Sequence, residues 1–564
     1  MKNKRRIIVI GGSAAGPKAA ARARRMDEFA EITMFQKGPD LSMASCGFPY
    51  YVGGFFDDRN QLLCTPTGAV RDPHFYWNAK GIVARTNTEV IKIDRQKKQV
   101  EFKNLHTGEM GSQAYDKLII ATGATANKPP IPGIGLEGIT TLQSMQDADY
   151  LRKIRDDGKI KKAVVIGGGL IGLETLEALQ LSGIELTLIE LLPQLLTFLD
   201  WKIAKLVENY LKTKANVITK NGVAEFIGEN GKLVAVKLQN GTEIPCDLAV
   251  VAIGVRPNTQ LAKEAGLEIG QLGGIIINKY MQTSDADIYA AGDCCEITNL
   301  ITGKNVLAPY GDLANLEGRV AGENCIKGNK ATFPGTIQTG VCKLFDYGVG
   351  ITGLSEEKAK EANIEYVKIV NASPDKPGFM NGKLLISKLL ADKNTQKILG
   401  VQCIGPGDVS KQLAIWATAI KGGLTVDDMV NADLPYAPPF SLAIDHSIAS
   451  AHIMQNKING LFEGVSALDL KEKIDRNEDL FILDVRGADE FEQTRLGIGE
   501  TLIPIGLLRK RIHELPSDKN KEIITYCKIS LRGYEAAVFI KAHGYTNVKV
   551  MEGGIAGWPF EKEK

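Results

Sequence analysis

The sequence predicts an α/β protein of several domains, and three observations lead to that prediction. A strand, a glycine-rich turn and a helix occur at about residues 6–26 and again at 162–181. A mixed α+β pattern follows at about 332–455, and a new α/β pattern runs from about 465 to the end. The chain of 564 residues is also too long for a single hydrophobic core, because domains commonly contain roughly 100–200 residues.

Composition and charge argue against several classes of protein. The chain is 44% hydrophobic and 24% charged, and its net charge of +2 gives no reason to expect nucleic acid or an anionic membrane as a partner. The apolar stretch 7–10 is too short for a signal peptide, and no run of roughly 18 apolar residues occurs. Nine cysteines without a C-x-x-C pair predict neither a disulfide framework nor a metal site. We therefore expect a cytoplasmic protein.

The first strand–turn–helix unit has the features of a site for a dinucleotide. Glycines at the start of a helix let a pyrophosphate approach the backbone N–H groups. In this unit Ser13 replaces the second glycine, and Gln36 stands where an acidic ribose ligand is usual. Gln36 can still accept a hydrogen bond through its carbonyl oxygen. Together with Asp293, which follows Ala-Ala-Gly, the unit is interpreted as the FAD site.

The second unit carries the full G-x-G-x-x-G pattern in Gly167, Gly169 and Gly172, between a strand and a helix. Glu190 ends the next strand, where a carboxylate binds the ribose hydroxyl groups. Leu191 and Leu192 follow without an arginine for a 2′-phosphate, so the unit is predicted to bind NADH. Across both units the predicted cofactor-binding residues are Gly11, Gly12, Ser13, Ala14, Ala15, Gly16, Gln36, Lys37, Ser42, Thr122, Gly123, Gly167, Gly169, Leu170, Ile171, Gly172, Glu190, Gly254, Gly292 and Asp293.

Two further strands, at 115–124 and 246–257, indicate that the second unit is inserted into the first domain. The predicted organisation is a split FAD-binding domain at 1–120 and 247–330, an NAD-binding domain at 121–246, an α+β domain at 331–455, a linker at 456–464 and a last α/β domain at 465–564.

Residues 42–50, Ser-Met-Ala-Ser-Cys-Gly-Phe-Pro-Tyr, contain one cysteine, Cys46. Together with the nucleotide units and the Ala-Thr-Gly, Ala-Ile-Gly-Val-Arg-Pro and Ala-Gly-Asp motifs, this segment resembles the pyridine nucleotide–disulfide oxidoreductases. The resemblance covers about residues 5–455 and is to the single-cysteine coenzyme A disulfide reductase branch, which includes NADH oxidases, NADH peroxidases and persulfide reductases. It implies two Rossmann-like domains for FAD and NADH, and a low-pKa Cys46 thiolate near the flavin.

The chemistry of Cys46 follows from its being alone. No second cysteine stands at the Cys-x4-Cys spacing of the dithiol enzymes, so a dithiol centre is excluded. A thiolate can attack an S–S bond of a substrate. The oxidised state of the site is then a mixed disulfide, a persulfide or a sulfenic acid.

The resemblance also implies a site for coenzyme A and a homodimer built through the α+β domain. Tyr436 matches a tyrosine that reaches the cysteine from the partner subunit. The residues at substrate-contact positions are Lys18, Arg22, Arg25, Ser42, Ser45, Arg71 and Asn315. Lys18, Arg22 and Arg25 lie about one turn apart on one face of the first helix.

Several positions depart from the family pattern. Met43 and Ser45 stand where Phe and Asn are frequent, and Ile444 replaces a lysine that meets coenzyme A. Lys376 replaces a second active-site tyrosine, and Asn315 replaces a histidine of some relatives. Ser45 is also compatible with the oxidase and peroxidase members.

The last domain resembles a rhodanese sulfurtransferase. Leu483-Asp-Val-Arg486 ends a strand, Cys527 and Arg532 have the Cys-x4-Arg spacing of sulfur-handling members, and Gly553-Gly-Ile-Ala-Gly-Trp558 follows. Successive backbone N–H groups around such a cysteine stabilise a thiolate and a persulfide. Arg532 is predicted to fix the loop or to bind an anionic donor. The alternative is a rhodanese-like module without catalysis.

These observations predict an NADH-dependent flavoprotein that reduces coenzyme A disulfide, coenzyme A persulfide or polysulfide. Cys46, Cys527, Tyr436 and Arg532 are the predicted catalytic residues, with Cys527 carrying sulfane sulfur. One alternative is an NADH oxidase or peroxidase that uses a Cys46 sulfenic acid, and dependence on oxygen or peroxide would distinguish it. Another is a non-catalytic redox or sulfide sensor. A colourless protein preparation, which indicates an empty flavin site, would support this alternative.

Overall fold

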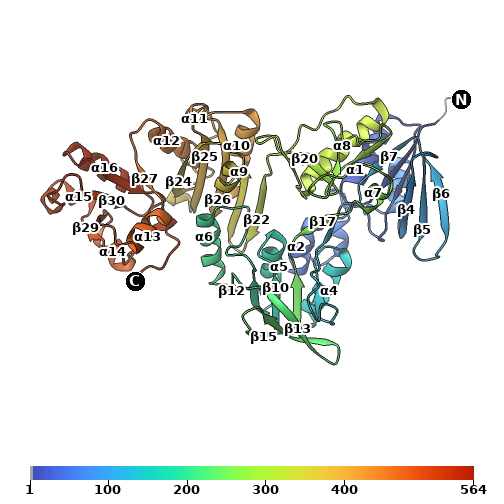
Figure 1. The fold of residues 1–564 in the computed structure, drawn as a ribbon, viewed down its shortest axis with the longest axis horizontal. Coiled ribbons are helices and arrows are strands. Elements are labelled where there is room, and N and C mark those ends of the chain that lie inside the picture. Colours follow the sequence, from blue (N-terminus) through green and yellow to red (C-terminus); the bar gives the residue numbers. More distant parts are fainter. Residues whose placement is uncertain (1–3) are drawn as a thin grey trace. The chain divides into compact units, whose positions relative to one another are not determined.

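The computed structural model describes residues 4–564 and divides into two compact units. The first extends to Pro193 and resumes at Ala215–Thr336, and the second comprises Gln194–Lys214 and Ile337–Lys564. In Figure 1 the chain is coloured from blue at its beginning to red at its end. Within the described residues 4–564, no helix has the length and apolar character needed to cross a membrane.

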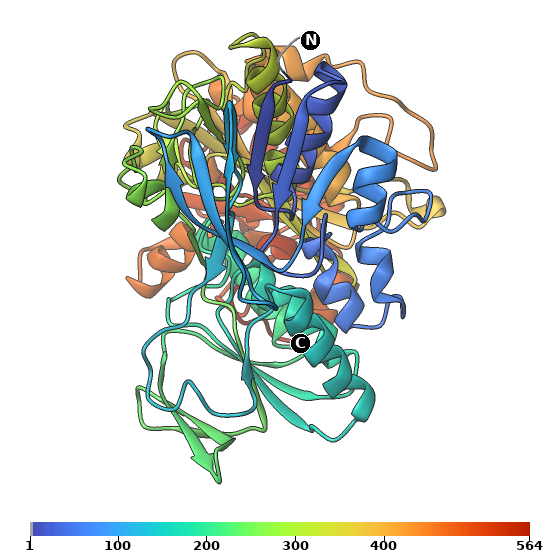
Figure 2. The same cartoon turned by 90° about the vertical axis from the view of Figure 1, so that its right-hand side faces the viewer.

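The first sheet is parallel, with the order β19-β7-β1-β2-β3. The apolar run of β1 makes it the central strand, and β1 and β2 run side by side in the same direction (Figure 2). Strand β19 comes from far along the chain and pairs with β7, so two separated segments build this sheet. Its strands are β1 (Arg6–Ile10), β2 (Glu31–Phe35), β3 (Ile82–Arg85), β7 (Lys117–Ile120) and β19 (Ile288–Ala290).

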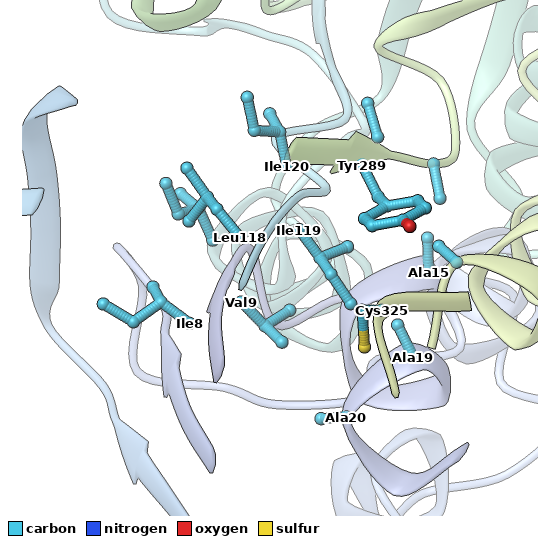
Figure 3. Close-up of a cluster of buried hydrophobic side chains, with 14 of the residues drawn as sticks. Ile8, Val9, Ala15, Ala19, Ala20, Leu118, Ile119, Ile120, Tyr289 and Cys325 are labelled. Atoms are coloured by element: carbon cyan, nitrogen blue, oxygen red, sulfur yellow. The ribbon is translucent and has the colours of Figure 1, made fainter. Parts of the chain in front are cut away.

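Helices α1 (Ala15–Met26) and α8 (Gly311–Lys327) lie against each other and supply the helical side of this core. Small residues allow the contact: a Cβ at Gly318 would lie 2.3 Å from the carbonyl oxygen of Ala15. Figure 3 shows part of the buried cluster between strands and helices, including Val9, Ile119 and Tyr289. The core therefore fixes the turn between β1 and α1.

The second sheet of this unit is also parallel, with the order β12-β11-β10-β16-β9, and α5 (Leu170–Gln180) follows its central strand β10. The remaining strands here are β10 (Lys162–Ile166), β11 (Glu185–Ile189), β12 (Asn216–Ile218), β16 (Leu248–Val251) and β9 (Ile139–Thr140). Two antiparallel three-stranded sheets accompany the parallel ones: β4 (Thr88–Asp94), β5 (Gln99–Asn104) and β6 (Met110–Ala114), and β13 (Val223–Glu229), β14 (Lys232–Leu238) and β15 (Glu243–Pro245).

The remaining helices, strands and turns complete the first unit. They are α2 (Phe48–Val52), α3 (Pro73–Lys80), α4 (Met145–Asp157), α7 (Gln260–Glu264), β8 (Ala124–Ala126), β17 (Val255–Pro257), β18 (Ile275–Ile276), β20 (Cys295–Thr298), β21 (Asn305–Val306) and the 3-10 turns Ser45–Gly47 and Arg59–Leu62.

The second unit contains an antiparallel sheet with the order β22-β23-β26-β25-β24, against which α10 (Val409–Gly422) and α12 (His446–Ile458) pack. The strands are β22 (Gly340–Leu344), β23 (Tyr347–Gly353), β24 (Tyr366–Pro374), β25 (Leu384–Asp392) and β26 (Ile398–Gly405), with α9 (Glu356–Glu361), α11 (Val426–Val430) and the 3-10 turn Gly378–Met380 between them. Helix α12 ends at Ile458, inside the segment 456–464 that was predicted to be a linker.

Helix α6 (Trp201–Leu211) belongs to this second unit, although the sequence places it within the predicted NAD-binding domain. Its buried face includes Ile203 and Val207. Asp200, just before the helix, accepts a hydrogen bond from the Gln402 amide of β26 at 2.7 Å. The domain boundaries 121–246 stay a prediction, and the packing of α6 shows that chain order and packing partner differ here.

The C-terminal part of the unit is a parallel sheet with the order β27-β31-β30-β28-β29, drawn in orange to red in Figure 1. Its elements are β27 (Gly464–Val465), α13 (Ala467–Asp475), β28 (Leu480–Asp484), α14 (Ala488–Gln493), β29 (Thr501–Leu502), α15 (Ile505–Leu508), β30 (Glu522–Tyr526), α16 (Leu531–Ala542), β31 (Val548–Met551) and the 3-10 turns Ile512–Glu514 and Ile555–Gly557.

Candidate active site

The two glycine loops have the same construction. Gly11 and Gly167 adopt positive φ angles of 112° and 109°. A Cβ would lie 1.9 Å from the Ala121 carbonyl oxygen in the first loop and 2.3 Å from that of Ala252 in the second. Only glycine fits either position, and the turn that results brings the loop backbone to the start of α1 or α5.

In each nucleotide unit, a polar side chain just after the second strand accepts a hydrogen bond from the glycine loop. The Gln36 carbonyl oxygen accepts a hydrogen bond from the Gly12 N–H at 2.8 Å. The Glu190 carboxylate accepts one from the Gly168 N–H at 2.7 Å and another from Leu192 at 2.8 Å. Gln36 thus takes the place that Glu190 has in the second loop, although it carries no charge.

A cavity of about 760 Å³ lies beside the first loop. Gly11, Gln36, Lys37 and Thr122, four of the predicted cofactor residues, contribute to its wall. The ammonium group of Lys37 forms an ion pair of 2.8 Å with Glu89. The wall also contains Val90, Asn258 and Thr259, which belong to none of the sequence motifs.

The Ala-Gly-Asp segment lies over a buried carboxyl group. The Gly292 N–H donates to Glu317 of α8 at 2.7 Å. Burial raises the pKa of Glu317 to about 8 and also raises the pKa of Asp293. Glu317 is therefore mostly protonated at neutral pH. No sequence motif indicates this role for Glu317, because a glutamate within a helix is usually exposed.

Cys46 lies in the short 3-10 turn Ser45–Gly47 and is exposed. The first residue of α8, Gly311, is beside it: a Cβ at Gly311 would lie 3.7 Å from the Cys46 Sγ. The positive end of a helix dipole stabilises a thiolate. The 17-residue helix α8 thus begins next to the predicted catalytic sulfur.

The side chains around Cys46 act against a thiolate. Protein atoms crowd the thiol although the residue is exposed, and this loss of hydration raises its pKa, as do the negative charges of Glu174, Asp293 and Asp312. The protein groups around Cys46 therefore raise its pKa, and the expected low thiol pKa is not what they produce. Glu174 itself, on α5, has its pKa raised to about 7 by burial and by Glu177.

The predicted substrate residues on α1 differ in their surroundings. Arg22 forms an ion pair with Glu323 of α8, so part of its charge is neutralised within the chain. Lys18 is half-buried and Arg25 is exposed on the same helix. The structure thus leaves Lys18 and Arg25 on the helix surface, and it gives Arg22 an acidic partner that the sequence did not reveal.

The remaining predicted substrate residues in this unit lie on loops and on α8. Ser42 is buried, its N–H donates to the Gly12 carbonyl at 2.7 Å, and its hydroxyl is 2.5 Å from that of Tyr76. Ser45 is exposed next to Cys46. The Arg71 guanidinium donates to the Leu63 carbonyl at 2.9 Å. The Asn315 amide donates to the Gly311 carbonyl at 2.7 Å, over the first turn of α8.

In the second unit, Tyr436 and Ile444 are 55% and 50% exposed. Lys376 is half-buried just before the turn Gly378–Met380. The role predicted for Tyr436, reaching the cysteine of a partner subunit, stays a prediction.

The rhodanese-like loop encloses its cysteine. Cys527 is fully buried at the end of β30, and the loop ends at Ser530 with a φ of 87° before α16. Arg532 of α16 is near enough to hydrogen-bond the Cys527 sulfur. Its guanidinium also donates to the two carboxylate oxygens of Glu490 at 2.7 and 2.9 Å. Asp484 and Arg486 form a buried ion pair of 2.6 Å at the end of β28.

Three family models match this chain. The model described as pyridine nucleotide-disulphide oxidoreductase matches residues 5–308. The chain belongs to this family. The family's dimerisation domain matches residues 339–448, and a rhodanese-like domain matches residues 466–560. The predicted fold class and family resemblance are thereby confirmed.

Individual relatives agree with the family models. The NAD(P)H coenzyme A polysulfide/persulfide reductase of Pyrococcus horikoshii is 33% identical over 80% of this chain and 99% of its own. The solved structure of a NAD-dependent persulfide reductase from A. fulgidus has a TM-score of 0.93 and 42% identity, covering 98% of this chain and 100% of that one. Reduced Bacillus anthracis CoADR-RHD has a TM-score of 0.92 and 35% identity, with coverage of 99% and 98%.

Proposed function

We propose that this oxidoreductase uses NADH and FAD to reduce coenzyme A persulfide, polysulfide or coenzyme A disulfide at Cys46. The observation that carries the proposal is the exposed Cys46, whose sulfur lies beside the first residue of α8, in a chain that also has a rhodanese-like domain with its own enclosed cysteine. The names of the Pyrococcus and A. fulgidus proteins support the same chemistry.

The sulfur chemistry balances with one NADH. The Cys46 thiolate attacks the outer sulfur of coenzyme A persulfide, which forms a Cys46 persulfide and releases coenzyme A thiolate. One NADH and one proton then convert this persulfide into the Cys46 thiol and hydrogen sulfide. With coenzyme A disulfide, the first step gives a mixed disulfide and one coenzyme A thiolate, and two electrons release the second.

Residues of the first compact unit fit both nucleotides. The cavity beside Gly11 has room for part of FAD, Gln36 can accept from a ribose hydroxyl, and Glu190 offers a carboxylate to the ribose of NADH. The chemistry that a bound flavin would supply here is two-electron transfer from NADH to sulfur. Gly311 leaves space beside the Cys46 sulfur, where a substrate sulfur must arrive.

The C-terminal domain is proposed to supply sulfane sulfur. The Cys527 thiolate attacks the outer sulfur of a donor such as thiosulfate, forms a persulfide and releases sulfite. Arg532 lies beside this sulfur and carries the positive charge that a persulfide anion needs. We also propose a cytoplasmic homodimer, which is supported by the dimerisation domain and by the nine free cysteines.

Anaerobic NADH oxidation with coenzyme A persulfide tests the proposal. Wild type should turn over and release sulfide, Cys46→Ser should lose turnover, and Cys64→Ser should keep it as a matched cysteine control. Turnover that requires oxygen or peroxide instead would establish the oxidase alternative. A colourless protein without turnover would leave the sensor alternative.

A further inference from the structure

The segment 551–556 of the rhodanese-like domain binds residues outside that domain through one glutamate. The Glu552 carboxylate forms an ion pair of 2.5 Å with Lys457 of α12 and accepts the Val370 N–H of β24 at 3.0 Å. The Glu552 carbonyl oxygen accepts a hydrogen bond from Lys202 of α6 at 3.1 Å. Glu552 and Lys202 are only 3% and 6% exposed, so these contacts lie within the protein interior.

The same segment supports the loop that carries Cys527. The Ile555 N–H donates to the Cys527 carbonyl at 3.0 Å, and the Ala556 N–H donates to that of Lys528 at 3.0 Å. The Ser530 hydroxyl donates to the Met551 carbonyl at 3.1 Å. These bonds tie the backbone of the sulfur loop to both sides of Glu552.

A glycine allows segment 551–556 to approach the Cys527 loop closely. Gly554 has a φ of 56°, and a Cβ there would lie 2.4 Å from the Cys527 carbonyl oxygen. The two backbones therefore touch, and a displacement of segment 551–556 must displace the Cys527 loop.

We infer that Glu552, Lys457 and Lys202 form a clasp that positions the Cys527 loop for sulfur transfer by fastening its supporting segment to α6 and α12. They are positioning residues, since none of them touches the sulfur. The inference rests on the proposed role of Cys527 as a sulfur carrier. Its consequence is that residues outside the rhodanese-like domain set the activity of that domain.

The clasp depends on charge because Glu552 is buried. A buried carboxylate that loses its cation is unfavourable unless it moves toward water or takes up a proton. Removing the ammonium group of Lys457 should therefore release Glu552 and loosen segment 551–556. The fold of the rhodanese-like domain should survive, because Lys457 belongs to α12.

Lys457→Met tests the clasp, with Lys457→Arg as the charge-retaining variant and Lys205→Met as the control. Lys205 lies on α6, as Lys202 does, but it takes no part in the clasp. Its ammonium group pairs with Glu208 of the same helix at 2.5 Å. Sulfur transfer from thiosulfate to cyanide by the full-length holoenzyme measures the chemistry at Cys527. Amide hydrogen exchange at 527–530 and 551–556 measures the support directly, without any activity.

In Lys457→Met we expect hydrogen exchange in both segments to rise about tenfold. The kcat of sulfur transfer should fall about tenfold with little change in KM, because the loop is displaced while Arg532 remains to bind the donor. Lys457→Arg should recover most of both effects, and Lys205→Met should behave as wild type. Unchanged exchange in Lys457→Met, or no recovery with arginine, would overturn the clasp.

Failure of the proposed function has a different signature. If wild type does not transfer sulfur, or if Cys527→Ser transfers it as well as wild type, the carrier role of Cys527 is wrong. The hydrogen-exchange result still decides whether the clasp holds the loop.

Discussion

At the scale of single residues, the carboxyl group of Glu174 acts on the Cys46 thiol. Its pKa is raised to about 7, so it is charged mainly above that pH. Its negative charge is, after loss of hydration, the largest cause of the raised pKa of Cys46. Glu174 therefore opposes thiolate formation in the same pH range in which the thiolate is needed.

We predict that Glu174→Gln lowers the pKa of the Cys46 thiol. The rate of Cys46 alkylation by iodoacetamide should rise relative to wild type above about pH 7. The difference should vanish below pH 6, where Glu174 of the wild type is neutral. Glu185→Gln, at an exposed position of β11, serves as a control. An equal alkylation rate for the two proteins at pH 8 would show that Glu174 does not control the thiol.

Glu490 acts in a comparable way on Arg532. It holds the guanidinium through two hydrogen bonds, and that contact lowers the pKa of Glu490 to about 2, so the pair is charged throughout the physiological range. We predict that Glu490→Gln lowers the KM for thiosulfate about tenfold, because a charged donor no longer competes with a carboxylate for Arg532.

Steady-state sulfur transfer measures this effect. Glu492→Gln, in the same helix α14, should leave the KM unchanged. A neutral organic trisulfide as donor should show no gain in Glu490→Gln. If both donors improve equally, the effect of Glu490 is not electrostatic selection of the donor.

The sequence was sufficient to single out Cys46 and Cys527 as candidates, since each lies in a short motif with few other uses. It was not sufficient for Glu174, Glu317 or Glu490. Each of these acids acts on a group distant in the chain, and nothing in the local pattern of a helix distinguishes an acid that faces a site from one that faces water.

At the scale of elements, the two strand–turn–helix units were predictable because the geometry of a glycine turn constrains its sequence. Gln36 could be placed in the first loop for the same reason. The pattern of the sequence alone did not reveal the packing partner of helix α6. Its apolar face at Ile203 and Val207 is typical of any amphipathic helix and does not indicate which sheet the helix packs against.

The burial of Lys202 on α6 has a measurable cost. Burial lowers the pKa of this ammonium group from 10.5 to about 8. Between these two values the folded protein binds fewer protons than the unfolded chain, so the free energy of unfolding rises with pH. We predict that wild type gains about 2 kcal/mol relative to Lys202→Met between pH 7 and 9.5.

Urea unfolding of both proteins at the two pH values measures this change. Tryptophan fluorescence is a suitable signal, because Trp201, Trp416 and Trp558 all lie in the second unit. A stability difference that does not depend on pH, or one that moves in favour of Lys202→Met as pH rises, would show that the pKa of Lys202 is not lowered in the folded protein.

At the scale of the whole molecule, the order of domains could be predicted because each carries its own motif. The two compact units could not, because they depend on contacts between segments far apart in the chain. The hydrogen bond between Gln402 and Asp200 and the ion pair between Lys457 and Glu552 are such contacts. Neither leaves a periodic signal in the sequence.

The central claim is that substrate sulfur is held on Cys46. Mass spectrometry of the protein with Cys46 as a free thiol, incubated anaerobically with coenzyme A persulfide and without NADH, tests it most directly. We expect the peptide that contains Cys46 to gain one sulfur atom, and one equivalent of NADH to remove it with release of sulfide. NADH oxidation without any adduct on Cys46, or an adduct on another cysteine that NADH removes, would contradict the account.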